Sequence, residues 1–451
     1  MVVLDTSITN VALPAIEKSL DFTPSSLQWV VTAYALTFGG FLLLGGRAAD
    51  LFGRRKMLLI GMISFTFFSL LIGLSHSAVM LIVLRALQGA AAAFMSPAAL
   101  SIVLTTFKEG KERNKALGLW TTVATGGAAV GLLLGGVLTE YFGWEWNFFI
   151  NVPVGILLSI AIAKFVPKQP RESKHTHMDL PGAALVTSGL VLFVYAISES
   201  PAWGILSTQT ISVLLLAIGL LIAFVYNESR SKHPLMPLSI FKIRNVVGAN
   251  LMMAPVAASL FGMFYLTSLY VQSVLQYNSL TAGLSFLPFP IILGIMSTQV
   301  PRLVSKYGYK RFLIAGPIII AVSLAWLSRL PVDGSYFVDV LPTILLMPVG
   351  VGMTFMPLFA AATSGVSADK SGLASGLITT SQQMGGALGL AVLSGVAAAV
   401  TGSSTALSQL VLGYDRAFFV AVFFVLTASF VGFTVIKQTR SQHAAPVVSV
   451  E

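Results

Sequence analysis

Two charged residues stand inside apolar stretches of the sequence, and their types suit proton chemistry. Asp5 lies in the run Leu4–Pro14, and Arg85 lies in the run Leu84–Gly89. A charged side chain within a membrane span costs at least about 2.5–3.5 kcal/mol on insertion scales, so such residues usually pair or mark proton and ion pathways. A buried carboxylate can gain and lose a proton, and Arg85 is its candidate partner. We therefore predict that Asp5 and Arg85 form a proton-coupling pair.

Each of these residues also has a simpler interpretation. Asp5 stands close to the first residue of the chain and would then only cap the first helix near the membrane interface. Arg85 would then extend its long side chain to the outer interface, as Arg often does. Both alternatives remain open from the sequence alone.

A basic loop after the second apolar stretch contains a second group of candidates. Asp50 precedes a helix start and can accept free backbone N–H groups or pair with Arg, and Gly53 permits a tight turn. We predict a conformational motif that stabilises one state of the protein; the alternative is an ordinary basic loop. Its residues are Gly46, Asp50, Gly53, Arg54 and Arg55.

Glycines dominate one apolar stretch between residues 126 and 136. Their spacing allows close helix packing of the small-xxx-small type. They are candidates for a gating role, and ordinary helix packing is the alternative. These residues are Gly127, Gly131, Gly135 and Gly136.

A weaker set of polar and aromatic residues within or beside the spans is expected to line a substrate cavity. Its two aromatic members, Trp29 and Tyr34, suit the membrane interface equally well. The set comprises Gln28, Trp29, Tyr34, Gln88, Asn151, Gln272, Gln276, Gln382 and Gln383.

The composition places these residues in a membrane. Of 451 residues, 56% are hydrophobic and only 10% are charged, whereas soluble domains carry about 25% charged residues. Uncharged runs of about 20 residues fit bilayer spans, and backbone groups in lipid require these runs to be helical. We predict an all-α polytopic protein with spans at 1–16, 27–48, 57–75, 78–106, 116–138, 147–166, 180–197, 210–226, 246–274, 283–304, 312–330, 340–363, 373–400 and 417–436.

The basic residues set the orientation of these spans. Of 27 Lys and Arg residues, 23 fall in alternate loops or the C-terminal tail, and only Lys18, Arg329 and Arg416 fall on the other side. The positive-inside rule then makes both termini cytoplasmic. The net charge of +10 reflects this topology and gives no reason to expect nucleic-acid binding. Because the first span is short and lacks a basic flank, we expect the ancestral start to lie upstream of Met1.

The chain has no Cys, and its five His residues all fall in expected loops or the tail. We therefore expect no cofactor and no metal site. A convergent set of nucleophile and base is also not visible, so we expect no enzyme.

An internal repeat divides the chain. Gly118, Gly127 and Gly131 recur with the same spacing as Gly376, Gly385 and Gly389, and the loop at 50–56 has an echo at 305–311. Two six-helix halves are the plan of many secondary transporters. We predict a bundle at 1–166, an inserted helix pair with its loops at 167–245, a second bundle at 246–436 and a cytoplasmic tail at 437–451.

These motifs resemble the major facilitator superfamily and, within it, the fourteen-helix drug:H⁺ antiporter family. The 50–55 loop and the segment with Arg85, Gln88 and Gly89 are similar to superfamily signatures. The segments 5–14, 144–155 and 372–389 are more particular to the antiporter family. The resemblance covers essentially the whole chain.

The resemblance implies proton-coupled export of amphipathic or drug-like molecules from the cell by alternating access, as in multidrug efflux and antibiotic resistance, with Asp5 and Arg85 in coupling. We expect a monomer that binds small-molecule substrates and protons in the lipid bilayer. Leu132 departs from the family pattern, because Pro usually follows Gly131, and Glu145 stands where Arg is usual. The departure at Leu132 keeps a metabolite symporter or uniporter open, and a membrane receptor or scaffold is the remote alternative.

Overall fold

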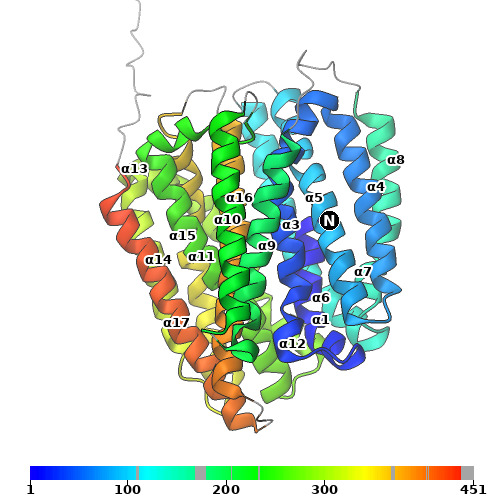
Figure 1. Ribbon diagram of the computed structural model, residues 1–451, viewed down its shortest axis with the longest axis vertical. Coiled ribbons are helices and arrows are strands. Elements are labelled where there is room, and N and C mark those ends of the chain that lie inside the picture. Colours follow the sequence, from blue (N-terminus) through cyan, green and yellow to red (C-terminus); the bar gives the residue numbers. More distant parts are fainter. Residues whose placement is uncertain are drawn as a thin grey trace, which may run out of the picture.

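The protein is a bundle of long helices that run roughly side by side (Figure 1). The structure, a computed structural model, describes residues 1–437 except 108–110, 168–178, 205, 232–233, 367–370, 403 and 405. Within these ranges no strand is present. The predicted cytoplasmic tail at 437–451 therefore lies outside the described residues, apart from residue 437.

The first part of the chain forms α1 (Val2–Ser19), α2 (Pro24–Leu27), α3 (Trp29–Phe52), α4 (Arg54–Gly73), α5 (Ala78–Thr106), α6 (Lys111–Tyr141), α7 (Trp146–Phe149) and α8 (Asn151–Phe165). Two helices follow, α9 (Leu180–Trp203) and α10 (Thr208–Arg230). The last part forms η1 (Leu238–Lys242), α11 (Arg244–Leu269), η2 (Tyr270–Val274), α12 (Ser279–Phe286), α13 (Pro288–Tyr307), α14 (Tyr309–Leu327), η3 (Tyr336–Val340), α15 (Leu341–Thr363), α16 (Ser371–Thr401) and α17 (Leu407–Thr434).

The prediction of an all-α polytopic membrane protein is confirmed. Among the described residues, thirteen helical segments are long and apolar enough to cross a membrane. The fourteenth helix, α1, has 18 residues and carries three charged ones, Asp5, Glu17 and Lys18. At 1.5 Å per residue it is about 27 Å long, close to the thickness of a bilayer core.

Several helices are longer than predicted. The largest difference is at α17, which begins at Leu407 and not at residue 417. The charges of Asp415 and Arg416 suggested a loop there. The helix continues through them, and the Asp415 carboxylate accepts a hydrogen bond from the backbone N–H of Leu330 at 3.0 Å. A satisfied carboxylate near a helix end is compatible with helical structure at the membrane surface.

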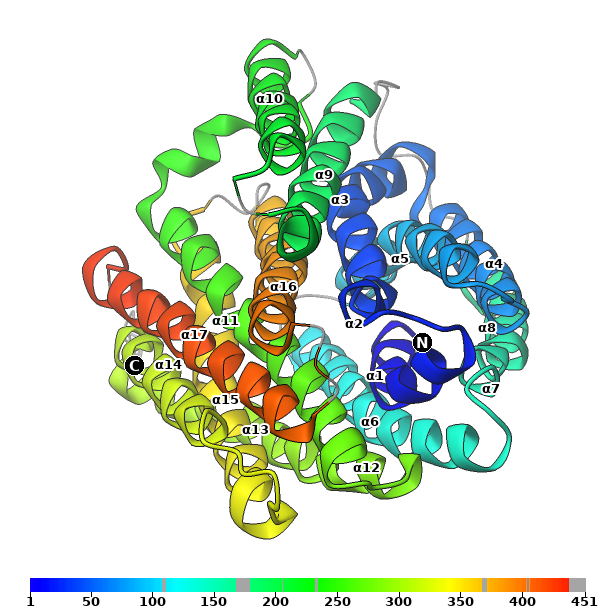
Figure 2. The ribbon, with the colours of Figure 1, turned by 60° about the horizontal axis from the view of Figure 1, so that its bottom comes forward.

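The helices pack in two groups, with α9 and α10 beside the line between them (Figure 2). In one group α5 packs with α3 and α4, α8 packs with α4, and α1 packs with α6; in the other α11 packs with α15, α16 and α17, and α14 packs with α15 and α17. The helix α9 contacts both α3 and α16, which also contact each other. The division of the chain into two bundles and an inserted pair, with its boundaries, stays a prediction.

The internal repeat appears in the backbone. Gly53 ends α3 and precedes α4 with φ +97°, and Gly308 ends α13 and precedes α14 with φ +77°. Both glycines therefore adopt the left-handed region that other residues rarely occupy. The two loops that resemble each other in sequence make the same kind of tight turn between equivalent helices.

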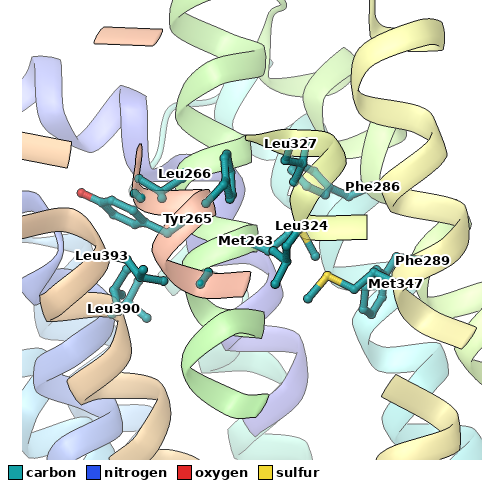
Figure 3. Packing of buried hydrophobic residues seen from close by; sticks show 14 of the residues in the cluster. Met263, Tyr265, Leu266, Phe286, Phe289, Leu324, Leu327, Met347, Leu390 and Leu393 are labelled. Atoms are coloured by element: carbon teal, nitrogen blue, oxygen red, sulfur yellow. The ribbon is translucent and has the colours of Figure 1, made fainter. Parts of the chain in front are cut away.

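Apolar side chains fill the second group of helices. Figure 3 shows Met263 of α11 near Leu324, on the same side as Phe286 and Met347, while Tyr265 and Leu266 lie on the other side of α11. Large exposed apolar residues cover the outside of α8, α10 and α17, as expected for a lipid-facing surface. Because lipid is as apolar as these side chains, close packing and buried hydrogen bonds hold such helices together.

Candidate functional site

The two charged residues singled out by the sequence meet inside the first group of helices. Arg85 Nη1 of α5 donates to Asp5 Oδ2 of α1 at 2.7 Å. Asp5 is 0% exposed and Arg85 1% exposed. The Arg85 side chain therefore does not extend to the outer interface, and Asp5 is more than a surface cap. Two opposite charges at this distance form a buried, charge-assisted ion pair.

Two amide side chains complete the shell around Asp5. Gln88 Nε2 donates to Asp5 Oδ1 at 3.0 Å, and Asn151 Nδ2 donates to the same oxygen at 2.9 Å. Gln88 Oε1 in turn accepts from Arg85 Nη1 at 2.6 Å. Both amide residues belonged to the predicted cavity set, and the structure places them in the Asp5 network, which draws on α1, α5 and α8.

Arg85 is held from three sides. Its Nε donates to the carbonyl oxygen of Val30 at 2.9 Å. Its guanidinium carbon lies 4.4 Å from the centre of the Tyr34 ring and 5.8 Å from that of Phe148. Cation–π contacts of this kind are strongest where water is excluded. Tyr34, another predicted cavity residue, thus packs against the ion pair.

The directions of the hydrogen bonds around Asp5 indicate which protonation state of its carboxylate this arrangement favours. Three donors point at its carboxylate: one from Arg85, one from Gln88 and one from Asn151. An ionised carboxylate only accepts hydrogen bonds, whereas a protonated one carries an O–H donor. If Asp5 took up a proton, its O–H group would point at one of the N–H groups that now donate to the carboxylate. The network therefore suits ionised Asp5, and it has to rearrange when Asp5 takes up a proton.

Sequence reasoning missed one member of this site, Ser69 of α4. Its hydroxyl accepts from Gln88 Nε2 at 3.2 Å and from Asn151 Nδ2 at 3.0 Å, and it donates to the carbonyl oxygen of Phe148 at 3.1 Å. The signal was a single Ser in an apolar helix, which is common in membrane spans because the hydroxyl can bond its own backbone. Only the packing of α4 against α5 and α8 reveals its role.

The loop between α3 and α4 has the turn that its sequence suggested. Arg54 lies 3.8 Å from Asp50, and Arg55 donates from Nη2 to the carbonyl oxygen of Ala163 on α8. Gly46 faces Pro97 on α5. Gly53, Arg54 and Arg55 therefore join α3, α4 and α8 at one end of the bundle, at some distance in the fold from Asp5.

The predicted gating glycines divide into different contacts. Gly131 and Gly135 face α1, where a Cβ would lie within 3.0 Å of backbone atoms of Leu4 or Ile8. Gly136 faces Leu280 of α12, so it lies between the two groups of helices. Gly127 has no neighbour within 4 Å of a Cβ position. Three of the four glycines thus permit close helix approach.

Two of the remaining predicted cavity residues lie near the start of α3. Gln28 donates through Nε2 to Ser198 of α9 and accepts through Oε1 from Ser394 of α16 at 2.5 Å. It therefore joins the first helix group, the inserted pair and the second group. Trp29 packs against Tyr195 with ring centres 6.1 Å apart.

The other predicted cavity residues belong to the second helix group. Gln272 donates to the carbonyl oxygen of Val11 at 3.1 Å and so contacts α1. Gln276 is exposed, with φ +57°, in the turn before α12. Gln382 and Gln383 are half-buried on α16, and Gln383 faces Gly39 of α3.

Among proteins of recorded function, several relatives cover nearly the whole chain. The cephamycin export protein CmcT of Amycolatopsis lactamdurans is 40% identical over 95% of this chain and 88% of its own length. The puromycin resistance protein pur8 of Streptomyces alboniger is 38% identical over 89% of this chain and 80% of its own. The multidrug resistance protein Stp of Mycobacterium tuberculosis is 35% identical over 88% of this chain and 74% of its own.

Solved structures share the fold. An autoinhibited POT family peptide transporter matches 98% of this chain and 97% of its own with a TM-score of 0.68 at 16% identity. The xylose transporter XylE of E. coli, in an inward-open conformation, matches with a TM-score of 0.64 at 13% identity over 98% of this chain and 95% of its own. The family model described as the Major Facilitator Superfamily matches residues 1–390. With the fold and the relatives in agreement, the chain belongs to the Major Facilitator Superfamily.

Proposed function

We propose that this protein exports small amphipathic, drug-like molecules across the cell membrane in exchange for protons. The observation that carries the proposal is the buried ion pair of Asp5 and Arg85, closed by Gln88, Asn151 and Ser69. The relatives named for antibiotic export and resistance support the direction of transport and the class of substrate. Both termini would face the cytoplasm, as the distribution of basic residues suggests.

Proton coupling follows from the chemistry of the Asp5 carboxylate. When Asp5 is ionised, it holds α1 to α5 through Arg85 and to α8 through Asn151. When a proton reaches it from the outer side, the ion pair loses its charge complementarity and one acceptor oxygen becomes a donor. The contacts of α1 must then change. Proton uptake and helix movement are thereby linked at one residue.

The protonated state has a hydrogen-bond acceptor within reach. Asn151 Oδ1 is buried and has no hydrogen-bond partner. Rotation of the Asn151 amide would present this oxygen to Asp5, and a protonated carboxyl group could then donate to it. Buried polar atoms are rarely left unpaired without a reason. The spare acceptor on Asn151 fits a site that has to satisfy two protonation states of Asp5.

The test is transport in proteoliposomes by Asp5→Asn. With an acid-inside pH gradient, wild-type protein should accumulate puromycin or a monovalent cationic dye in the lumen against its gradient. Asp5→Asn should lose this uphill accumulation, because Asn cannot release a proton, while substrate exchange down its own gradient persists. Asp21→Asn is a matched control, since Asp21 is exposed with φ +52°, a conformation that Asn tolerates. Uphill transport by Asp5→Asn at the wild-type rate would refute Asp5 as the coupling site.

A further inference from the structure

A second buried carboxylate cluster lies where α9 begins and α10 ends, away from the Asp5 network. Asp179 precedes α9 and accepts from the backbone N–H of Gly182 at 2.8 Å. Asn227 Nδ2 of α10 donates to both oxygens of Asp179, at 3.0 Å and 2.8 Å. Asp179 is 8% exposed. The capping of α9 by Asp179 accounts for these contacts. It does not explain why a second buried carboxylate lies beside Asp179.

That second acid is Glu228 of α10, which is only 3% exposed. Its Oε2 accepts from the backbone N–H of Met236 at 2.9 Å. Its Oε1 is buried and has no hydrogen-bond partner. A Cβ built on Gly182 would lie 2.9 Å from this Oε1 and 2.9 Å from Asp179 Oδ2, so the two carboxylates border the same small space.

Two buried carboxylates that face one space repel each other unless one of them carries a proton. Among the described residues, Asp179 is the charged side chain that acts on Glu228. The other charged side chains on the surrounding elements are Arg47 and Asp50 on α3, Glu199 near the far end of α9, Arg230 on α10 and Lys242 in η1, while Lys232 and His233 lie outside the described residues.

We propose that Glu228 is a second proton-binding site of this protein. The proton binds at Glu228 Oε1, and the resulting O–H donates to Asp179 Oδ2, which stays ionised. This arrangement removes the repulsion and satisfies the only oxygen of the pair that has no partner in the described structure. Asp179 Oδ2 has a lone pair for this bond besides the one that accepts from Asn227.

The proton would act on the connecting segment, residues 234–243, which leads from α10 into α11. Leu235 packs with Leu44 of α3 and Ala183 of α9. Met236 packs with a cluster that includes Leu377 of α16. The segment therefore contacts both groups of helices, and the hydrogen bond from the Met236 N–H to Glu228 attaches it to the inserted pair.

Protonation of Glu228 removes its repulsion with Asp179, so Glu228 stays buried against the connecting segment. Loss of the proton strengthens the single bond from the Met236 N–H, but it restores the repulsion between two buried carboxylates, and we propose that the repulsion dominates. With the proton gone, a charged carboxylate without a full set of partners faces Asp179 in a buried place, and the segment can release Glu228 to water. Because the segment touches α3 and α16, its release frees the two groups to move at this end of the molecule. The site is separate from the proposed Asp5 coupling and does not depend on it.

The experiment is hydrogen–deuterium exchange of the segment in wild type and Glu228→Gln, from about pH 5 to about pH 9, a range in which a buried Glu can titrate. Gln imitates the protonated acid, because its Oε1 can accept from Met236 and its Nε2 can donate to Asp179. The ratio of the two exchange rates cancels the intrinsic effect of pH. The segment that holds Ser335, whose N–H bonds Asp339, is the reference.

At acid pH we expect the segment to exchange at nearly the same rate in wild type and in Glu228→Gln. At alkaline pH it should exchange roughly tenfold faster in wild type, as for a buried carboxylate that loses its partner. The reference segment should show no such change. Asp179→Asn should also abolish the pH dependence, since its amide can donate to ionised Glu228, so it serves if Glu228→Gln folds poorly. A ratio that stays constant with pH overturns the proposal. Protection that follows added Na⁺ or Ca²⁺ at fixed pH overturns it too, because the ligand would then be a metal cation.

Discussion

Removing the charge of Arg85 should destabilise the protein in a way that depends on pH. Arg85→Gln deletes the donors to Asp5 Oδ2, Gln88 Oε1 and the Val30 carbonyl oxygen. It leaves the Asp5 carboxylate buried with two neutral amide donors. Removing one partner of a buried ion pair costs about 3–5 kcal/mol. We expect a loss of this size in the free energy of unfolding at neutral pH.

The pH dependence has a definite sign. In Arg85→Gln, the folded state gains from a proton on Asp5, whereas Asp in the unfolded chain is already ionised above about pH 4. The folded state therefore binds more protons than the unfolded state, and stability rises as the pH falls, by up to about 1.4 kcal/mol per pH unit for one proton. In the wild-type protein Arg85 supplies the counter-charge that the variant lacks, so the difference in stability between the two proteins should narrow as the pH falls.

A double-mutant cycle with Asp5→Asn isolates the interaction. The Asn amide cannot satisfy all three donors around Asp5, since one of its two atoms is itself a donor, and Arg85 is left buried without a counter-charge. Asp5→Asn alone should therefore also be costly. The cost of each single variant comes largely from the uncompensated charge that it leaves buried. The double variant leaves no such charge, so it should lose less stability than either single variant.

The assay is unfolding by SDS in mixed micelles, followed by helical circular dichroism at several pH values. If the two single losses simply add in the double variant, Asp5 and Arg85 do not interact as the 2.7 Å contact indicates. If Arg85→Gln has the same pH profile as wild type, Asp5 does not take up a proton in the folded state, and the proposed coupling loses its chemical basis.

Two further predictions concern topology and packing. Single cysteines at the exposed Ser239 and Ser335, introduced into a chain that has no Cys, should differ in labelling by an impermeant maleimide: Ser335→Cys should react in intact cells, and Ser239→Cys only in opened membranes. Labelling of Ser239→Cys in intact cells would contradict the predicted orientation of the helices. Gly389→Ala should lower stability by about 1–3 kcal/mol through overpacking, because its Cβ would lie 2.4 Å from the Cα of Ala258. The matched control Gly127→Ala, with open space at that position, should be neutral or slightly stabilising; equal losses in both variants would contradict the packing explanation.

The helical architecture could be predicted from the sequence because lipid allows few solutions for the backbone. The Asp5–Arg85 pair could be predicted for a related reason, since charges in apolar spans are rare and need partners. The pairing of Gln88 and Asn151 with Asp5 could not, although both residues were singled out. A polar side chain in a span indicates a polar environment, but its partner depends on helix rotation and contact, which one sequence does not contain.

The cluster at Asp179 and Glu228 was missed for a different reason. Both acids stand at the ends of apolar runs, where an acid usually caps a helix or faces water. Asp179 does cap α9. The burial of Glu228 arises only because the connecting segment returns over the end of α10 and places the Met236 N–H against it. Such a contact is tertiary and leaves no periodic signal in the sequence.

The internal repeat allows Asp5 to be compared with the residue at the equivalent position in the second helix group. Gly131 faces Leu4 on α1, and its repeat partner Gly389 faces Ala258 on α11, so Ser259 is the counterpart of Asp5 in the second helix group. Ser259 is buried, and its single O–H is shared between the carbonyl oxygens of Pro255 and Ala421 at 3.0 Å and 3.2 Å. A hydroxyl bound to backbone carbonyls does not change charge at physiological pH.

The duplicated scaffold thus carries an ionisable group at this position in one half and a neutral one in the other. Around Ser259 the second half is filled by close apolar packing, which has one favourable arrangement. Around Asp5 the first half has a polar network whose hydrogen-bond directions depend on one proton. If proton binding moves helices, the movement should therefore begin at α1 against α5 and α8, with the second half serving as the more rigid partner.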